Sequence, residues 1–294
     1  MKILIAISSK EYSAPTLQVG MIAAKAYNAS VTIAYVGQKI SAFGTSDVGL
    51  AQESNAKWGI ERPGVRVLEW AFNYLADNNY INPEIASAGF QRNTLVNHGK
   101  NRLELHLKGN YCEEVDLILR RGDIIPELRN EVAQNGYDIT VIGRSKKRRM
   151  AHDLVQYIDS SIYVARDLLP FKDFRLLQAV DDSKGTSKAL LYGSQVAKAF
   201  NMPVDVLTVS KRESFGKGYM GAHKKALKIF EKVGIKPVSM LKVGDPVNTI
   251  LDTATKRHLI VMGVSQLNPI IQFFKGSKPL KIMKKCNSPI MIVK

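Results

Sequence analysis

A stretch from Gly263 to Ser277 combines residue types that suit a phosphorylated ligand. It ends in Gly276 and Ser277, directly before a predicted helix over 278–285. Glycine lets a phosphate come close to the backbone, and a helix N-terminus offers free N–H groups and the positive end of its dipole. Lys278 adds positive charge at the same place. The stretch is therefore predicted to form a phosphate-binding loop.

An acidic residue follows a predicted strand in the same half of the chain. The strand covers 176–180, and Asp181 comes directly after it, where its carboxylate can accept hydrogen bonds from ribose hydroxyls or an adenine amino group. Ligands of open parallel sheets bind beyond the carboxyl ends of the strands, where the strand order reverses. An aspartate after a strand is by itself a common turn residue. The two segments together, on both sides of the expected reversal, predict a nucleotide site.

Short apolar runs alternate with longer amphipathic stretches through both halves of the chain. In the second half, the runs 176–180, 204–209 and 259–262 are rich in β-branched residues, which is typical of strands buried on both faces. Helical spacing over 187–200 and 222–233 places lysines on the outer side. This alternation predicts parallel strands with helices on both faces, so the fold class is α/β, doubly wound and Rossmann-like.

The chain is a tandem repeat. Residues 2–36 align with 175–209 without a gap, and seven of the 17 positions that begin at Gly20 and Gly193 are identical. Self-similarity at a fixed offset indicates that one structural unit occurs twice. We therefore predict two doubly wound domains with the same order of elements.

The two predicted domains differ in length. The first covers 1–168 and the second 172–294, and only the first carries an insertion, at about 37–114. Within the insertion, residues 66–78 have helical spacing, and the polar stretch 90–109 is expected to form a hairpin or a lid.

The sequence resembles the universal stress protein family in its tandem two-domain form. In members that bind ATP, the fourth strand is followed by a glycine, two residues, a second glycine, nine residues, and then Gly-Ser or Gly-Thr. Gly263, Gly276 and Ser277 occupy three of these four positions with the expected spacing, and Gln266 stands at the remaining one. The resemblance covers most of both halves, apart from about 37–114.

The resemblance implies a role for each residue of the predicted site. Asp181 would contact the nucleoside, and the backbone near Val180 and Val209 would hold the adenine. The side chain of Gln266 either blocks the phosphate loop or points to solvent and donates an amide hydrogen bond. The ribose and the phosphates would be surrounded by Met262, Gly263, Gly276 and Ser277.

The first half departs from the family pattern. Its first strand ends in Ser8 in place of an aspartate, and Gln156 and Tyr157 stand where Gly-Ser is expected. We therefore expect no nucleotide in this half, whose role would be to pair with the second. By the resemblance, residues 162–165 would lie beside 290–293 within the chain. The resulting unit would have pseudo-two-fold symmetry and could also form a homodimer.

The net charge of +16 is concentrated in the second half. Residues 169–294 hold 22 basic and 8 acidic residues, whereas 1–168 hold 20 and 18. Such an excess predicts an anionic ligand or partner in the second half. A further basic run, 146–149, lacks the interleaved aromatic residues on which nucleic-acid bases stack.

Other chemistries find no motif in the sequence. The five histidines match no metal-binding pattern such as H-E-x-x-H, so neither a metal ligand nor a catalytic residue is predicted. The absence of P-loop and nucleophile-elbow motifs argues against an NTPase or a hydrolase. With two cysteines a disulfide framework is not expected. No apolar run has membrane-helix length, so a cytoplasmic location without a membrane partner is expected.

The function that we favour is regulatory binding of an adenine nucleotide, ATP or AMP, by the second domain, with Mg²⁺ as a companion of the phosphates and little or no turnover. The resemblance implies a role in the stress response and a protein partner of unknown identity. Two alternatives stay open. One is a scaffold of the same fold that binds no nucleotide, and the other is a nucleic-acid binder that uses the basic second half.

Overall fold

The second half alternates strands and helices as the sequence predicts. The computed structural model describes residues 1–37, 64–91, 94–98, 102–143, 148–166, 174–264 and 278–294. Neighbouring strands of the second half run parallel, as helical crossovers require. The elements are β8 (Arg175–Val180), α7 (Lys184–Ala199), β9 (Val204–Ser210), α8 (Lys217–Lys232), β10 (Val238–Val243), α9 (Pro246–Thr253), β11 (His258–Gly263), α10 (Lys278–Lys285) and β12 (Ile290–Val293).

The first half repeats this arrangement. Its elements are β1 (Lys2–Ile7), α1 (Lys10–Tyr27), β2 (Ser30–Gly37), β5 (Glu114–Arg121), α5 (Ile124–Asn135), β6 (Ile139–Ile142), α6 (Arg148–Tyr157) and β7 (Ser161–Val164). The spatial order β5-β2-β1-β6-β7 corresponds strand by strand to β10-β9-β8-β11-β12. The prediction of two doubly wound units of one fold is therefore confirmed.

The insertion extends the sheet of the first half. It contributes α3 (Val65–Asp77), α4 (Pro83–Ala88), β3 (Val96–Asn97) and β4 (Arg102–Lys108). β3 and β4 form an antiparallel hairpin, and β4 pairs antiparallel with β5. Of the two forms expected for residues 90–109, the structure has the hairpin, and α3 agrees with the helix predicted over 66–78.

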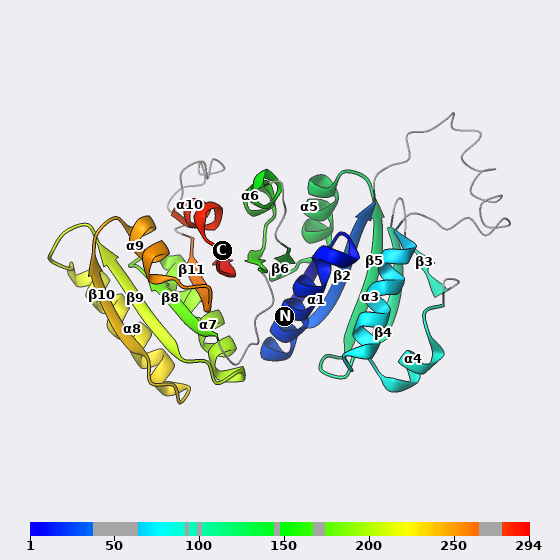
Figure 1. Cartoon of the computed structure of the whole chain (residues 1–294), viewed down its shortest axis with the longest axis horizontal. Helices are drawn as coiled ribbons and strands as arrows, with labels where there is room; N and C mark the ends of the chain where they lie inside the picture. Colours follow the sequence, from blue (N-terminus) through cyan, green and yellow to red (C-terminus); the bar gives the residue numbers. More distant parts are fainter. Residues whose placement is uncertain (38–63, 92–93, 99–101, 144–147, 167–173, 265–277) are drawn as a thin grey trace.

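All described strands belong to one sheet, with the order β10-β9-β8-β11-β12-β7-β6-β1-β2-β5-β4-β3. Figure 1 shows the two halves side by side, with β10 at one end of the sheet and β3 at the other. The halves join where β7 pairs antiparallel with β12, through Ile162 opposite Ile292 and Val164 opposite Ile290. The expected pairing of the two fifth strands within the chain is therefore confirmed.

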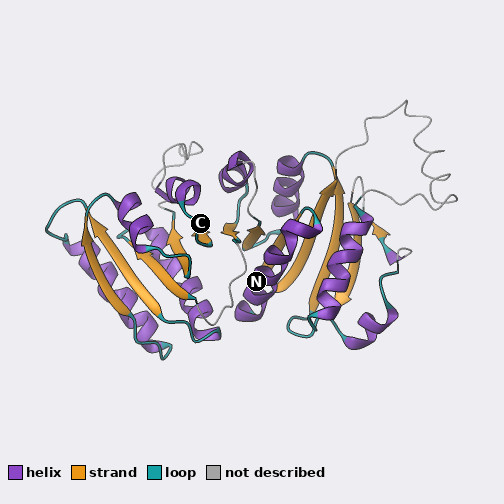
Figure 2. Cartoon of the chain, viewed as in Figure 1, coloured by secondary structure: helices purple, strands orange, loops and turns teal. Residues whose placement is uncertain are grey.

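Helices cover both faces of this sheet (Figure 2). One apolar core lies under α1, α3, α7 and α8, and includes Leu17, Leu68 and Phe230. The other lies under α5, α6, α9 and α10, and includes Leu128 and Ile282. The strands are buried on both sides, which explains why their sequences are almost continuously apolar. The predicted boundary between 168 and 172, and residues 146 and 147 of the basic run, lie outside the described residues.

Candidate functional site

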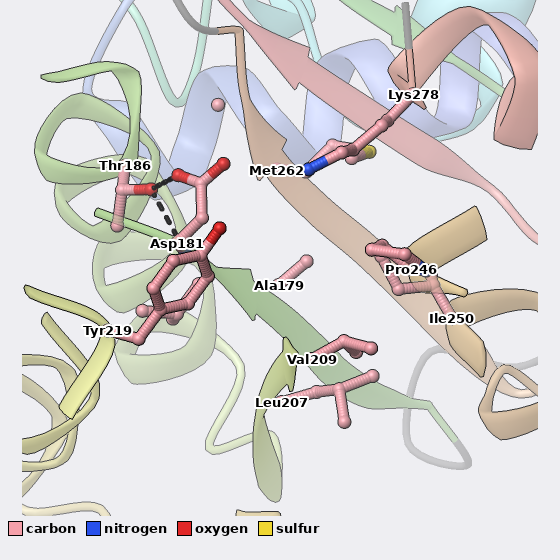
Figure 3. Close-up of a pocket in the computed structure, with 12 residues that line it drawn as sticks. Ala179, Asp181, Thr186, Leu207, Val209, Tyr219, Pro246, Ile250, Met262 and Lys278 are labelled. Carbon is pink, nitrogen blue, oxygen red and sulfur yellow. Dashed lines mark hydrogen bonds between the residues drawn. The ribbon is translucent and has the colours of Figure 1, made fainter. Parts of the chain in front are cut away.

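A pocket lies at the carboxyl ends of β8, β9 and β11. β8 lies between β9 and β11. The chain continues from β8 to β9 on one side and later returns to β11 on the other side, so the strand order reverses between β8 and β11. This is the point at which ligands bind in doubly wound sheets. The pocket is lined by Ala179, Val180, Asp181, Thr186, Leu207, Val209, Tyr219, Pro246, Ile250, Met262, Gly263 and Lys278 (Figure 3).

Asp181 is held in a fixed orientation by the start of α7. Its Oδ1 accepts hydrogen bonds from the hydroxyls of Ser183 and Thr186, each at 2.6 Å, and from the Ser183 backbone N–H at 3.1 Å. In return, the Asp181 backbone N–H donates to the Thr186 hydroxyl at 3.3 Å. Within the described residues no hydrogen bond reaches Oδ2, and Figure 3 shows this oxygen pointing away from Thr186. As far as the described residues go, Oδ2 is therefore free to accept a hydrogen bond from a ligand.

Apolar side chains form the walls of the pocket. Val180, Val209 and Met262 come from the ends of three neighbouring strands, and Ile250 comes from α9. Each is less than one tenth exposed, because Val180 packs into the core under α7 and α8 and the other three pack into the core under α9 and α10. A flat aromatic base would bury further apolar surface against such walls.

The start of α9 is fixed by a capping interaction. Asp245 accepts a hydrogen bond from the backbone N–H of Asn248 at 3.0 Å, and Pro246 takes a place in the first turn. Both features suit a helix N-terminus, since aspartate satisfies a free N–H and proline has none to satisfy. The cap places Pro246 and Ile250 on the pocket wall.

Gly263 allows β11 and α7 to pack backbone to backbone. A Cβ added to Gly263 would lie 2.3 Å from the carbonyl carbon of Gly185, and one added to Gly185 would lie 2.2 Å from the carbonyl oxygen of Val264. No side chain fits in either position. The expected place of Gly263 beside the ribose and the phosphates stays a prediction, and the structure adds a packing role at the pocket that Asp181 and Met262 line.

Six of the nine residues predicted for the site line this one pocket: Val180, Asp181, Val209, Met262, Gly263 and Lys278. The other three, Gln266, Gly276 and Ser277, lie outside the described residues, so the two readings of the Gln266 side chain both stay predictions. Among the described lining residues, Asp181 is the only acidic and Lys278 the only basic side chain. Lys278 is the first residue of α10, where the helix dipole adds to its charge.

Sequence reasoning missed six residues that line the pocket: Ala179, Thr186, Leu207, Tyr219, Pro246 and Ile250. Thr186 follows Asp181 by five residues, and its spacing suits a return hydrogen bond to the strand end, which was a usable signal. Tyr219 enters from the first turn of α8, and no motif marks it. Burial raises the pKa of the Tyr219 phenol, and the charges of Asp182 and Asp181 raise it further. The phenol is therefore a hydrogen-bond donor at neutral pH.

The equivalent position of the first half lacks the carboxylate. The backbone N–H of Ser8 donates to the hydroxyl of Ser13 at 2.9 Å, which matches the bond from Asp181 to Thr186 in the second half. Gln156 and Tyr157 belong to the last turn of α6. The repeat thus keeps the backbone geometry of the strand end without the acidic acceptor, and the expectation that this half binds no nucleotide stays a prediction.

The fold and the pocket place the chain among the doubly wound α/β proteins, which bind ligands where the strand order reverses. Residues 174–294 match the model of the universal stress protein family. Over those residues the chain is therefore a universal stress protein domain, and its first half carries a second unit of the same fold.

Solved structures share the fold over the whole length of the chain. A universal stress protein from Archaeoglobus fulgidus DSM 4304 is 16% identical, with a TM-score of 0.60, and the match covers 100% of this chain and 96% of that one. A functionally unknown protein from Pseudomonas aeruginosa PAO1 is 11% identical, with a TM-score of 0.60 and coverage of 100% and 92%. At such identities the likeness shows the fold. No curated protein sequence matches the chain.

Among the helices that the structure describes, none combines the length and the apolar character needed to cross a bilayer.

Proposed function

We propose that this chain binds an adenine nucleotide, ATP or AMP, in the pocket at the ends of β8, β9 and β11, and acts as a regulatory protein with little or no turnover. The observation that carries the proposal is the placement of the free Asp181 oxygen beside apolar walls, with Lys278 on the opposite side (Figure 3). A nucleotide has matching parts: a flat apolar base, hydroxyls that donate hydrogen bonds, and negative phosphates.

The proposed roles follow from this match. Oδ2 of Asp181 accepts a hydrogen bond from a ribose hydroxyl or from the adenine amino group. The base lies against Val180 and Val209, and Met262 and Gly263 border the ribose. Lys278 and the N-terminus of α10 attract the phosphates, with Mg²⁺ as a companion ion when ATP is bound.

The size of the pocket constrains how the nucleotide lies. The hollow has a volume of about 40 Å³, whereas enclosed small-molecule sites hold about 300 Å³ or more. The nucleotide therefore covers the mouth of the pocket and inserts one group into it. Slow turnover is part of the proposal because the described lining residues offer no paired base and nucleophile, which hydrolysis requires.

The experiment is to denature the purified full chain and identify released nucleotides by mass spectrometry. Calorimetric titration of nucleotide-free protein with ATP, with AMP, and with ATP plus Mg²⁺ follows. We expect about one adenylate per chain, since the first half lacks the acidic acceptor. A chain that releases no nucleotide and does not respond to millimolar ATP would refute the proposal and favour the scaffold function.

A second candidate function, binding of nucleic acid, is favoured by one observation. Lys224, Lys228 and Lys232 follow one another along the outer face of α8 and, together with Lys225, line a shallow groove. A row of cations suits a phosphate backbone. Titration with single-stranded DNA at two salt concentrations tests it, because this binding should weaken steeply with salt and with a Lys224→Gln, Lys228→Gln double substitution. Nucleotide binding in the pocket should weaken less with salt and should not respond to the double substitution.

A further inference from the structure

The β3–β4 hairpin gathers two histidines and a glutamate on one face of the sheet. Val96 pairs with Glu104, and the backbone N–H of His98 donates to Arg102, so the end of β3 lies beside the start of β4. Side chains two residues apart on a strand point to the same face, which places Glu104 and His106 together. The three residues belong to the insertion at the β3 end of the sheet, in the half without the proposed nucleotide pocket (Figure 1).

The potential metal-binding atoms of the three side chains converge. Nε2 of His98 and Nε2 of His106 each lie 3.8 Å from Oε2 of Glu104. Each of the three residues offers one ligand atom that lies within 4.8 Å of those of the other two. Three ligands of a tetrahedral Zn²⁺ ion are about 3.3 Å apart. Small rotations of the two imidazoles would therefore bring all three atoms to bonding distance.

An acidic residue orients one of the imidazoles. Asp116 lies opposite His106 in the pairing of β4 with β5, and its Oδ1 is 2.7 Å from Nδ1 of His106. An ionised carboxylate only accepts hydrogen bonds, so Nδ1 carries the proton and Nε2 presents its lone pair to the cluster. Carboxylates orient metal-binding histidines in this way in zinc proteins.

The glutamate is anchored without losing its capacity as a ligand. Arg102 binds both carboxylate oxygens of Glu104, and its Nη2 is 3.1 Å from Oε1. The Arg102 guanidinium also pairs with Glu131, from Nε to Oε2 at 3.3 Å, so it does not neutralise Glu104 alone. A carboxylate offers about four lone-pair directions, which leaves one for a metal beside the bonds from arginine.

The cluster is open to an ion from solvent. The side chain of Glu104 is 7% exposed, whereas those of His98 and His106 are 51% and 62% exposed. A rigid buried carboxylate with two exposed imidazoles above it leaves a fourth coordination position for water.

From this arrangement, we propose that His98 Nε2, Glu104 Oε2 and His106 Nε2 bind a divalent transition-metal ion of the Zn²⁺ class, with water as the fourth ligand. Two imidazoles and one carboxylate favour Zn²⁺ and its neighbours Co²⁺ and Ni²⁺ over Mg²⁺ and Ca²⁺, which prefer oxygen ligands alone. Asp116 acts as a positioning residue through His106. The proposal is independent of nucleotide binding.

The test uses the full chain without an affinity tag, after chelator treatment. Calorimetry with ZnCl₂ should show one ion per chain, and Co²⁺ should develop the visible absorption bands of a tetrahedral site. His98→Gln and His106→Asn should each abolish both signals. Asp116→Asn should weaken Zn²⁺ binding by about 10–100-fold, as loss of an orienting partner does.

The matched control is Asn97→Gln, an exposed change directly before His98 at the end of β3, which should leave Zn²⁺ binding unaltered. Circular dichroism of each variant shows whether the fold is retained, which is expected because both histidines are exposed. A wild-type chain that takes up no Zn²⁺ or Co²⁺ would overturn the site, and so would uptake that survives the loss of either histidine.

Discussion

At the carboxylate of Asp181, one oxygen is used by the fold and the other is available to a ligand. Oδ1 receives hydrogen bonds from Ser183 and Thr186, which orient the group, while Oδ2 lies on the pocket side. A preoriented acceptor loses little entropy when a ligand binds, so its contribution to affinity is retained. A substitution of Asp181 can therefore change the contact with the ligand and still keep the hydrogen bonds from Ser183 and Thr186.

Asp181→Asn should weaken nucleotide binding without unfolding the chain. The amide oxygen can still accept the bonds from Ser183 and Thr186, whereas the amide nitrogen replaces a charged acceptor with a neutral donor. A hydrogen bond to a charged group contributes about 1.5–3 kcal/mol, so calorimetry should show at least about a tenfold loss of affinity. Asp182→Asn, a neighbouring and exposed change of the same charge, should leave the affinity for nucleotide unchanged.

Between elements, the contact of β11 with α7 determines the shape of the pocket. Two glycines, Gly185 and Gly263, let the helix lie directly against the strand end, and the carboxylate of Asp181 is then carried beside Met262. The contact requires that neither glycine has a side chain, so the addition of a single methyl group tests it.

Gly263→Ala should destabilise the chain and weaken nucleotide binding together. The new methyl group would lie 2.3–2.4 Å from the backbone of Gly185, which can move only with α7 as a whole. We expect a loss of about 1–3 kcal/mol in the free energy of unfolding, measured in urea. Gly221→Ala makes the same change on α8 with nothing within 4 Å, and should instead stabilise by about 0.5–1 kcal/mol. Equal effects of the two substitutions would contradict the packing argument.

A buried histidine ties α8 to the sheet. Nδ1 of His223 is 2.9 Å from the Thr208 hydroxyl on β9, and Nε2 is 2.7 Å from the Ser239 hydroxyl on β10. Burial lowers the pKa of His223 below its usual value of 6.5, because the charged imidazolium would be poorly solvated there.

This shift predicts that acid weakens the second half. With a lowered folded pKa, the unfolded chain takes up the proton first, so the free energy of unfolding decreases as pH falls through 6.5 toward the folded value. The contribution is fully present above pH 6.5. Urea unfolding of the wild type and of His223→Gln at several pH values measures the difference. An identical pH dependence of the two proteins would show that His223 is not responsible.

For the whole molecule, the antiparallel pairing of β7 with β12 makes two repeats into one sheet. Ile162, Tyr163 and Val164 lie opposite Ile292, Met291 and Ile290, and all six are buried. The hydrogen bonds and apolar contacts of this seam belong to both halves. We therefore expect the halves to stabilise each other.

Ile292→Ala should expose this coupling. The side chain is fully buried, so its truncation should cost about 2–5 kcal/mol. Hydrogen exchange should accelerate in β7 as well as in β12, since the substitution removes apolar contacts between the two strands. Leu68→Ala, an equally buried change in α3, should accelerate exchange near the insertion and leave β12 protected. Exchange confined to β12 in Ile292→Ala would mean that the halves unfold independently.

The sequence by itself determined the elements, the repeat and the place of the pocket. Strand and helix patterns depend on neighbours in the chain, and the alternation of the two predicts a doubly wound sheet whose order reverses beside β8. Asp181 was identified because it stands at a strand end, whereas Val180 and Met262 were implied by the resemblance to the universal stress protein family. The packing of Gly263 against Gly185 could not be predicted in this way, since the contact joins residues far apart in the chain.

Only the tertiary structure decided which distant residues meet. Tyr219 reaches the pocket from a helix that no motif connects with Asp181. No metal motif contains His98, Glu104 and His106. They come together only through the pairing of the hairpin and the alternation of side chains along β4. The seam between β7 and β12 likewise pairs strands from the two halves of the chain. Patterns of local spacing do not record such contacts, since the packing of the whole chain creates them.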